Sequence, residues 1–305
     1  MGTVSVNADR YASLEYQGIY LRNEWGDVLF PDLRPDGAQA AAEGEPLKPD
    51  ELIGDGRPGR FYQRTAAITA TWAAGLGISA RRVCDVGGST GRLLHELAKR
   101  LPDAEELVLA EPSAAFCSWA RRLLLGEDFD RWVPMPGPTL RADHRRVEPT
   151  CLPKSIPQAL VYQVTASDIP RPEGYFDVVT CANVLDRVDD PVAFAGEVTR
   201  LLRQGGLLVI ASPMHFDEHY TSRDRWIGDV REVLDPVHWR VDDREVDVRY
   251  EVWQARRRII SYLSQVVGAV KRPESCLSRC QARVISGEPG KRHGSACCRL
   301  APRSG

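Results

Sequence analysis

Short apolar runs alternate with amphipathic segments through the central part of the chain. The apolar runs are too short for buried helices and resemble buried strands, whereas the segments between them carry apolar residues at helical spacing. The predicted strands cover residues 83–86, 107–110, 159–165, 176–181 and 207–211. The predicted helices cover residues 59–77, 91–101, 114–125 and 191–202. This alternation is typical of an α/β fold with a mostly parallel sheet and helices on both faces.

The pattern changes outside this alternation. Residues 126–157 are rich in proline and predict an irregular insertion, and residues 226–239 predict a helix followed by a loop. Apolar and charged residues alternate over residues 246–252, which predicts a half-exposed strand. Apolar residues in the stretch 259–270 follow a helical period and predict a helix.

The chain divides into three parts on this basis. Residues 1–58 form an N-terminal cover segment of partly helical character, which we expect to pack on the domain that follows. Residues 59–270 form that domain and include the insertion. Residues 271–305 form a basic tail that contains cysteines, and we expect this tail to be disordered. Binding of an anionic partner by the tail is the alternative.

The composition is that of an ordinary globular protein, with 43% hydrophobic and 27% charged residues. No apolar run approaches the roughly 20 residues that span a bilayer, and the first residues lack the pattern of a secretory leader. We therefore expect a cytoplasmic protein that uses no membrane and keeps its eight cysteines reduced. A net charge of −2 gives no reason to expect a nucleic acid partner, and no trusted ligand spacing predicts a metal site.

Candidate chemistry begins in the segment RVCDVGGSTGR at residues 82–92. Strand, glycine turn and helix follow in this order, which is how an α/β sheet presents backbone N–H groups to a ligand. Gly87, Gly88, Ser89 and Gly91 form the turn, where glycine permits positive φ angles and a close approach of the ligand. Asp85 ends the strand and can accept a hydrogen bond from that ligand.

Four segments resemble those of class I S-adenosylmethionine (SAM)-dependent methyltransferases. They are CDVGGSTG, with Ser89 at the place of the middle glycine, LVLAEPS, GYFDVVTCANVLDRVDDP, and LLRQGGLLVIASP, with Gln204 where proline is usual. The resemblance implies a Rossmann-like sheet of the seven-stranded type and SAM as the cofactor that donates the methyl group. It also implies that Glu111 holds the ribose hydroxyls and that Asp168, or the backbone beside it, contacts the adenine.

The glycine spacing favours this family over a dehydrogenase. Glu111 lies 20 residues after Gly91, which suits either ligand, because a carboxylate there can hold two ribose hydroxyls. A dinucleotide requires the spacing G-x-G-x-x-G, so that a helix N-terminus faces the pyrophosphate. The glycines here follow GGxxG, and Asp85 would repel a phosphate. SAM carries an ammonium and a sulfonium group instead, which a pocket with carboxylates favours.

The segment NVLDRVDDP at residues 183–191 bears on the methyl acceptor. It resembles the corresponding stretch of the DREV-type protein-histidine methyltransferases. That resemblance implies that Asn183 and Asp186 hold the target imidazole, with Asp186 fixing the tautomer so that the other ring nitrogen faces the methyl group. The alternative is that these two residues only cap the next turn.

Three functions remain open at this point. The favoured hypothesis is methyl transfer from SAM to an imidazole nitrogen of a protein histidine. The first alternative is a small-molecule N- or O-methyltransferase. The second alternative is a non-catalytic methyltransferase-like module that binds a partner.

Overall fold

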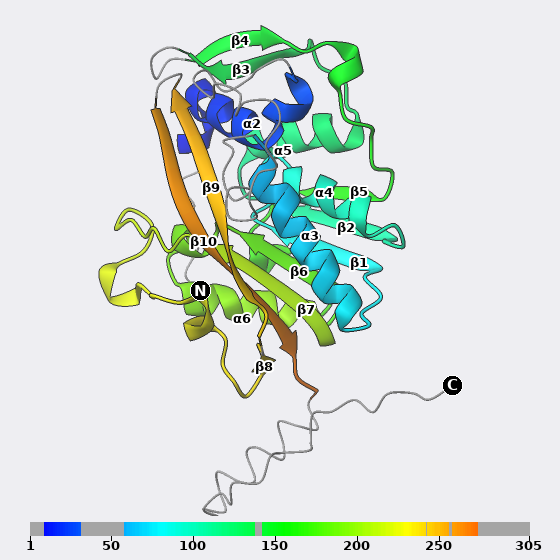
Figure 1. The fold of residues 1–305 in the computed structure, drawn as a ribbon, viewed down its shortest axis with the longest axis vertical. Helices are drawn as coiled ribbons and strands as arrows, with labels where there is room; N and C mark the ends of the chain where they lie inside the picture. The colour runs from blue at the N-terminus through cyan, green and yellow to red at the C-terminus, as the bar shows by residue number, and fades with distance from the viewer. Residues whose placement is uncertain (1–8, 32–57, 138–141, 242, 256–257, 274–305) are drawn as a thin grey trace, which may run out of the picture.

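One β-sheet with helices on both faces organises the protein (Figure 1). The computed structural model describes residues 9–31, 58–137, 142–241, 243–255 and 258–273. The strands of the sheet are β1 (Arg82–Val86), β2 (Glu106–Ala110), β5 (Ala159–Tyr162), β6 (Phe176–Ala182), β7 (Leu202–Ser212), β8 (Trp239–Arg240), β9 (Glu245–Ala255) and β10 (Arg258–Lys271). A separate hairpin consists of β3 (Trp132–Pro136) and β4 (Ala142–Arg146). The α-helices are α1 (Asp9–Ala12), α2 (Leu14–Leu29), α3 (Arg60–Gly75), α4 (Arg92–Arg100), α5 (Ala114–Ala120) and α6 (Pro191–Leu201).

The strands of the sheet follow the order β5-β2-β1-β6-β7-β10-β8, and β9 pairs with β10 beside this path. From β5 to β7 every neighbouring pair is parallel, whereas β10 is antiparallel to β7, β8 and β9. The predicted α/β fold with a mostly parallel sheet is confirmed.

Alternate residues of each central strand enter opposite hydrophobic cores. In β7, Leu207 and Val209 belong to one core, while Leu208 and Ile210 belong to the other. Helices α2, α3, α4 and α5 contribute to the first core, and α6 contributes to the second. Because successive side chains of a strand point to opposite faces, this division requires helices on both sides of the sheet.

The four predicted helices are present as α3, α4, α5 and α6. Ser113 is the N-cap of α5, because its hydroxyl oxygen accepts a hydrogen bond from the backbone N–H of Phe116 at 3.3 Å. The helix then continues as a π-helical turn, Arg121–Leu125. Asp190 caps α6 in the same way, with Pro191 at the first helical position.

The helix predicted for residues 259–270 is wrong, because these residues belong to β10. This strand pairs with β7 between Gln265 and Val270, and its other edge pairs with β9. β-branched residues such as Val266 and Val267 suit a buried strand. The outer edge of β7 presents backbone hydrogen-bonding groups that a neighbouring strand completes, and this pairing overrides the local helical period. The half-exposed strand predicted at residues 246–252 is confirmed as part of β9.

The predicted insertion is not wholly irregular, because it contains the β3–β4 hairpin. Strand β3 lies close against α2: a Cβ atom on Gly18 would be 3.0 Å from the backbone carbonyl carbon of Met135. Among the described strands β3 pairs only with β4, which explains how it accommodates Pro134 and Pro136.

The helix predicted within residues 226–239 is also wrong. In this region, which the structure describes completely, there are the 3₁₀ turn Val230–Val233 and the start of β8, and no α-helix. Gly228 and Pro236 interrupt the stretch, and both residues disfavour a helix interior. Residues 1–8 and 32–57 of the predicted cover segment and residues 274–305 of the predicted tail lie outside the described residues.

Asp177 joins the amino-terminal ends of three central strands. Its Oδ2 accepts hydrogen bonds from the backbone N–H groups of Arg81 at 3.1 Å and Arg82 at 2.8 Å. Its Oδ1 accepts a hydrogen bond from Nε of Arg203 at 2.6 Å. Since Arg82, Asp177 and Arg203 belong to β1, β6 and β7, this carboxylate fixes the strands at the edge opposite their carboxyl ends.

We expect Asp177→Asn to lower the free energy of unfolding by about 1–3 kcal/mol. The amide loses the charge that strengthens three hydrogen bonds and places a donor group against other donors. Urea denaturation at neutral pH measures the change. The exposed Asp103 provides the control, because Asp103→Asn should change the stability by less than about 0.5 kcal/mol. Equal effects of the two substitutions would contradict this role of Asp177.

Candidate active site

The direction of strand order reverses between β1 and β6, which is the topological switch point where open α/β sheets bind ligands. A cavity of about 640 Å³ lies at this point, within the roughly 300–1,000 Å³ of small-ligand sites. Asp85, Glu111 and Asn183 line it from the carboxyl ends of β1, β2 and β6. Side chains from α2, β9 and β10 form another part of its wall.

The turn between β1 and α4 requires glycine at two positions. Gly87 has a φ of +69°, and a Cβ atom there would be 2.3 Å from Cγ2 of Val184. Gly91 has a φ of +93°, and a Cβ atom there would be 2.6 Å from Cδ1 of Leu124. Gly87 and Gly88 line the cavity, so bare backbone faces a ligand at this place, whereas Gly91 begins α4 behind the wall.

Ser89 stands in the turn with a φ of +50°. Its backbone N–H donates a hydrogen bond to Oε2 of Glu111 at 3.0 Å. The left-handed region costs a residue with a side chain about 1–2 kcal/mol, so the surrounding contacts must hold Ser89 in place. The hydrogen bond to Glu111 therefore ties the turn after β1 to the end of β2.

Two buried carboxylates face the cavity. Oδ1 of Asp85 accepts a hydrogen bond from Oγ1 of Thr180 at 2.7 Å, while Oδ2 has no hydrogen-bond partner within the described structure. The oxygens of Glu111 accept backbone N–H groups from Ser89 and, at 2.9 Å, from Ser113. Burial raises the pKa of Asp85 and the pKa of Glu111 to about 7. Such a pair favours a ligand that brings positive charge and hydrogen-bond donors.

Asn183 and Asp186 meet at the cavity wall after β6. Asn183 has a φ of +56°; its Oδ1 accepts a hydrogen bond from Oγ of Ser264 at 3.2 Å, and its Nδ2 lacks a partner among the described residues. Asp186 is 1% exposed, and neither carboxylate oxygen accepts a hydrogen bond from a described residue. Burial raises the pKa of Asp186 against the opposing effect of the Arg187 guanidinium, which lies 3.7 Å away. Both residues thus retain unused hydrogen-bonding capacity at the cavity.

Asp168 is not brought together with these residues. It lies in the 3₁₀ turn Ala166–Asp168, is exposed, and accepts a hydrogen bond from Oγ1 of Thr165 at 2.7 Å. Thr165, Ala166 and Ser167 line the cavity, but Asp168 is not part of its wall. An adenine contact through the backbone of this segment stays a prediction.

Tyrosines are site residues that the sequence motifs do not identify. Seven of the nine tyrosines in the chain line the cavity: Tyr11, Tyr16, Tyr20, Tyr62, Tyr220, Tyr250 and Tyr262. They come from elements before and after the central alternation of strands and helices, which is why no single motif contains them. The aromatic residues of the predicted cover segment were the one available signal.

The chain matches a family described as a methyltransferase domain over residues 56–265, which is more than half of its length. The chain belongs to this family. It carries a methyltransferase domain of the SAM-dependent class.

The methyltransferase is also similar to two curated proteins, the ubiquinone biosynthesis O-methyltransferases of Psychrobacter cryohalolentis and Psychrobacter arcticus. Each is 26% identical over 139 residues, which cover 46% of this chain and 43% of the relative. The match therefore spans less than half the length of these relatives. Similar solved structures include a SAM-dependent methyltransferase from Aquifex aeolicus, with 16% identity, a TM-score of 0.43, and coverage of 74% of this chain and 100% of that one. The YcgJ protein from Bacillus subtilis has 13% identity, a TM-score of 0.44, and coverage of 69% and 99%.

Two features are absent from the parts of the chain that the structure describes. No helix there combines the length and apolar character that crossing a bilayer requires. No group of three or more His, Cys, Asp or Glu side chains there has an arrangement suited to a metal ion.

We expect the cofactor-free methyltransferase to show a pH-dependent cost of burying Asp85. Its folded pKa of about 7 lies above the value of about 4 in an unfolded chain, so its stabilising contribution is complete below pH 4 and is lost as the pH rises toward 7. Asp85→Asn removes this titration while keeping an oxygen for Thr180. The thermal midpoint of the variant should therefore rise relative to the wild type between pH 5 and pH 8.

Differential scanning calorimetry of both proteins at the two pH values tests this expectation. The comparison between variant and wild type is required because His95, whose pKa burial lowers to about 4, titrates with the opposite sign in the same range. A difference in midpoint that does not change with pH would contradict the buried, raised state of Asp85.

Proposed function

We propose that the methyltransferase binds SAM between the glycine turn and Glu111. The unpartnered Oδ2 of Asp85 is the observation that supports this placement, because a buried carboxylate oxygen without a donor suits the ammonium group of SAM. A Cβ atom on Gly88 would lie 2.9 Å from that oxygen and would cover it. Glu111 keeps free lone pairs for the ribose hydroxyls, and the turn formed by Gly87, Gly88, Ser89 and Gly91 provides the backbone.

The proposed acceptor is a small molecule held in the same cavity beyond Asn183. Helix α2 and the strands β9 and β10 close this part of the cavity with tyrosine rings. Tyr20 and Phe116 lie 4.7 Å apart between ring centroids, and Tyr62 and Tyr250 lie 6.4 Å apart. Burial raises the pKa of Tyr20, Tyr62 and Tyr250, so these phenols stay neutral and serve as hydrogen-bonding aromatic walls. The curated relatives, which are named as O-methyltransferases, agree with a small acceptor.

A protein histidine is the second candidate acceptor. It is favoured by the two unused groups at the wall, the Nδ2 donor of Asn183 and the carboxylate acceptor of Asp186. An imidazole would donate its N–H to Asp186 and keep the lone pair of its other nitrogen for the methyl group. A hydroxyl group of a small molecule has the same capacity, so the tyrosine-lined wall of the cavity decides our preference.

When bound, SAM supplies an electrophilic methyl group. The proposed role of Asp186 is to accept the hydrogen bond, and finally the proton, of the acceptor atom. Its burial favours this role, because a carboxylate with a raised pKa is a stronger base. The amide of Asn183 would orient the acceptor from the other side. Most of the acceleration would then come from positioning the nucleophile in line with the methyl group.

Incubation of the full chain with methyl-labelled SAM and a cell extract tests the acceptor class. Separation of the products by size should place the label in the small-molecule fraction. Label in acid-stable form on protein histidines would instead support the second candidate. An absence of transfer to either fraction, together with tight SAM binding, would favour a non-catalytic binding module.

We expect Asp186→Asn to reduce turnover of the identified acceptor at least about a hundredfold, the usual scale for loss of general base catalysis. The affinity for S-adenosylhomocysteine, measured by calorimetry, should stay within about twofold of the wild type, because Asp186 is assigned to the acceptor. Asp189→Asn is the matched control: Asp189 lines the same cavity but is 69% exposed. Full turnover of Asp186→Asn would remove the acceptor assignment.

A further inference from the structure

Helix α2 is connected to the glycine turn through Thr90, whose side chain is fully buried. Nε1 of Trp25 donates a hydrogen bond to Oγ1 of Thr90 at 3.0 Å. The indole N–H can only donate, so the hydroxyl proton of Thr90 is free to be donated to Oε2 of Glu24. The two hydrogen bonds therefore run in one direction, from the indole of Trp25 through the hydroxyl of Thr90 to the carboxylate of Glu24.

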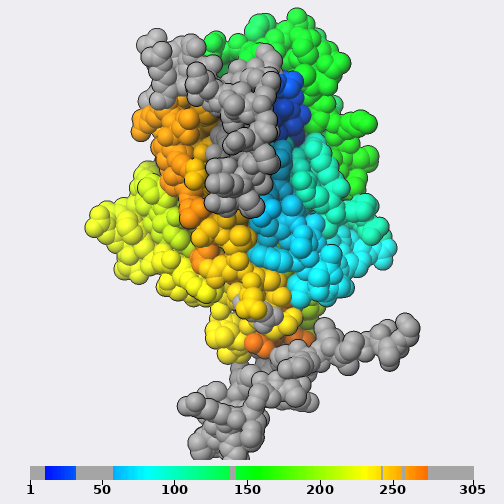
Figure 2. Space-filling view, viewed as in Figure 1, coloured from blue at the N-terminus to red at the C-terminus, as the bar shows by residue number. Residues whose placement is uncertain are grey.

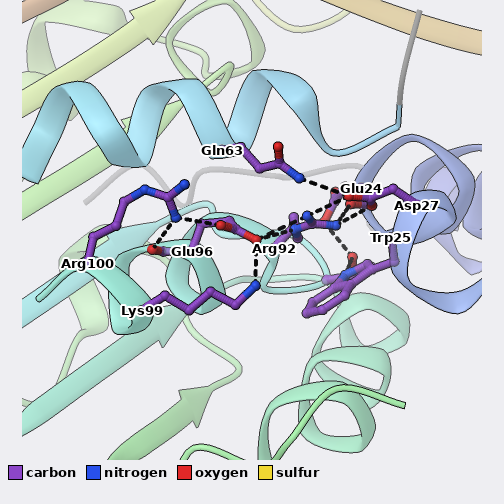
Figure 3. A network of polar contacts seen from close by, with 9 residues as sticks. Glu24, Trp25, Asp27, Gln63, Arg92, Glu96, Lys99 and Arg100 are labelled. Carbon is purple, nitrogen blue, oxygen red and sulfur yellow. Dashed lines mark hydrogen bonds and ion pairs between the residues drawn. The ribbon is translucent and has the colours of Figure 1, made fainter. Parts of the chain in front are cut away.

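A second connection lies on the other side of Gly91. Arg92, the first residue of α4, donates hydrogen bonds from Nη1 to the backbone oxygen of Glu24 and to Oδ1 of Asp27, both at 2.6 Å. Its Nη2 donates to Oδ2 of Asp27 at 2.9 Å, and Nε2 of Gln63 donates to the same oxygen at 2.9 Å. Figure 3 shows Asp27 of α2 between Arg92 and the Gln63 side chain of α3. Both residues that flank Gly91 are thus held by α2.

These contacts reach beyond the family match, which covers residues 56–265 and leaves α2 outside. Glu24 and Trp25 are 0% exposed, so α2 is an integral part of the protein core. A neighbouring face of the same helix lines the cavity with Ile19, Tyr20 and Asn23. Helix α2 therefore contacts Thr90 of the glycine turn with one face and lines the cavity with a neighbouring face.

We propose that Glu24 is a positioning residue for SAM binding, which acts through Thr90 to hold the turn 87–91 in its binding conformation. The turn needs such support because Ser89, directly before Thr90, is held at a φ of +50°. With Thr90 anchored, the N–H of Ser89 points to Glu111 and the backbone of Gly87 and Gly88 stays open to the cofactor. This inference rests on the proposed assignment of the turn to SAM.

A set of substitutions in the full chain, each measured by calorimetry with SAM, tests the proposal. Glu24→Met removes the acceptor at similar volume, and Thr90→Val replaces the hydroxyl by a methyl group. Each should weaken SAM binding about tenfold, and the double variant should bind no more weakly than the weaker single variant, because both changes break one interaction. Glu24→Gln keeps an oxygen for Thr90 and should stay within about threefold of the wild type.

Glu96→Gln is the control for a purely structural effect. Glu96 pairs with Arg92, Lys99 and Arg100 in α4 and makes none of the described hydrogen bonds to the turn. This variant should lower the thermal midpoint and leave the SAM affinity unchanged, which separates stability from cofactor positioning. If Glu24→Met does not fold, the SAM affinity of the near-isosteric Thr90→Val variant tests the proposal.

Two results would overturn the inference. One is wild-type SAM affinity in folded Glu24→Met and Thr90→Val. The other is a loss in Glu24→Gln as large as in Glu24→Met, which would mean that the charge of Glu24, and not its bond to Thr90, matters. Asp85→Lys tests the underlying assignment separately: SAM binding that survives this change would reject the turn as the cofactor site, whatever Glu24 does.

Discussion

Burial of negative charge around one glycine turn is the constraint on which this structure depends. Glu24, Asp85 and Glu111 come from α2, β1 and β2, and burial raises the pKa of each to about 7. The charge of Glu24 further raises the pKa of the other two carboxyl groups. A buried carboxylate requires a proton, a donor or a cation. In the proposed placement, a cofactor with an ammonium and a sulfonium group meets this requirement for Asp85 and Glu111, while the hydroxyl of Thr90 donates to Glu24.

The elements outside the central α/β alternation shape the rest of the cavity. Helix α2 packs between the β3–β4 hairpin and the glycine turn, and β9 extends along β10 beyond the parallel strands (Figure 1). In the space-filling view, β9 and β10 form a continuous surface next to α3 (Figure 2). The glycine-turn end of the cavity is thus built on the parallel strands, while α2, β9 and β10 contribute tyrosines to its other end. Differences in acceptor among proteins with this sheet are expected to reside in such segments.

The positions of Asp85, the glycine turn and Glu111 at the carboxyl ends of β1 and β2 were predictable because their signals are local. Asp85, the turn that follows it and Glu111 sit at the ends of two short buried strands, and periodicity identifies those strands. The same local reasoning failed for residues 259–270, where a helical period competed with the demand of β7 for a partner. It also failed for Pro134 and Pro136, since proline indicates a loop unless a strand has a free edge to accommodate it.

Local sequence was sufficient for the parallel strands, the glycine turn and the positions of Asp85 and Glu111 at the strand ends, because each depends on residues close together along the chain. Three-dimensional packing was required for the rest. The Thr90–Glu24 contact joins residues 66 positions apart, and the Asn183–Ser264 contact joins residues 81 positions apart. Packing also leaves the buried Asp186 without a hydrogen-bond partner among the described residues and turns Asp168 to the surface. Burial and unused hydrogen-bonding capacity are properties of the assembled core, and the order of residues along the chain does not encode them locally.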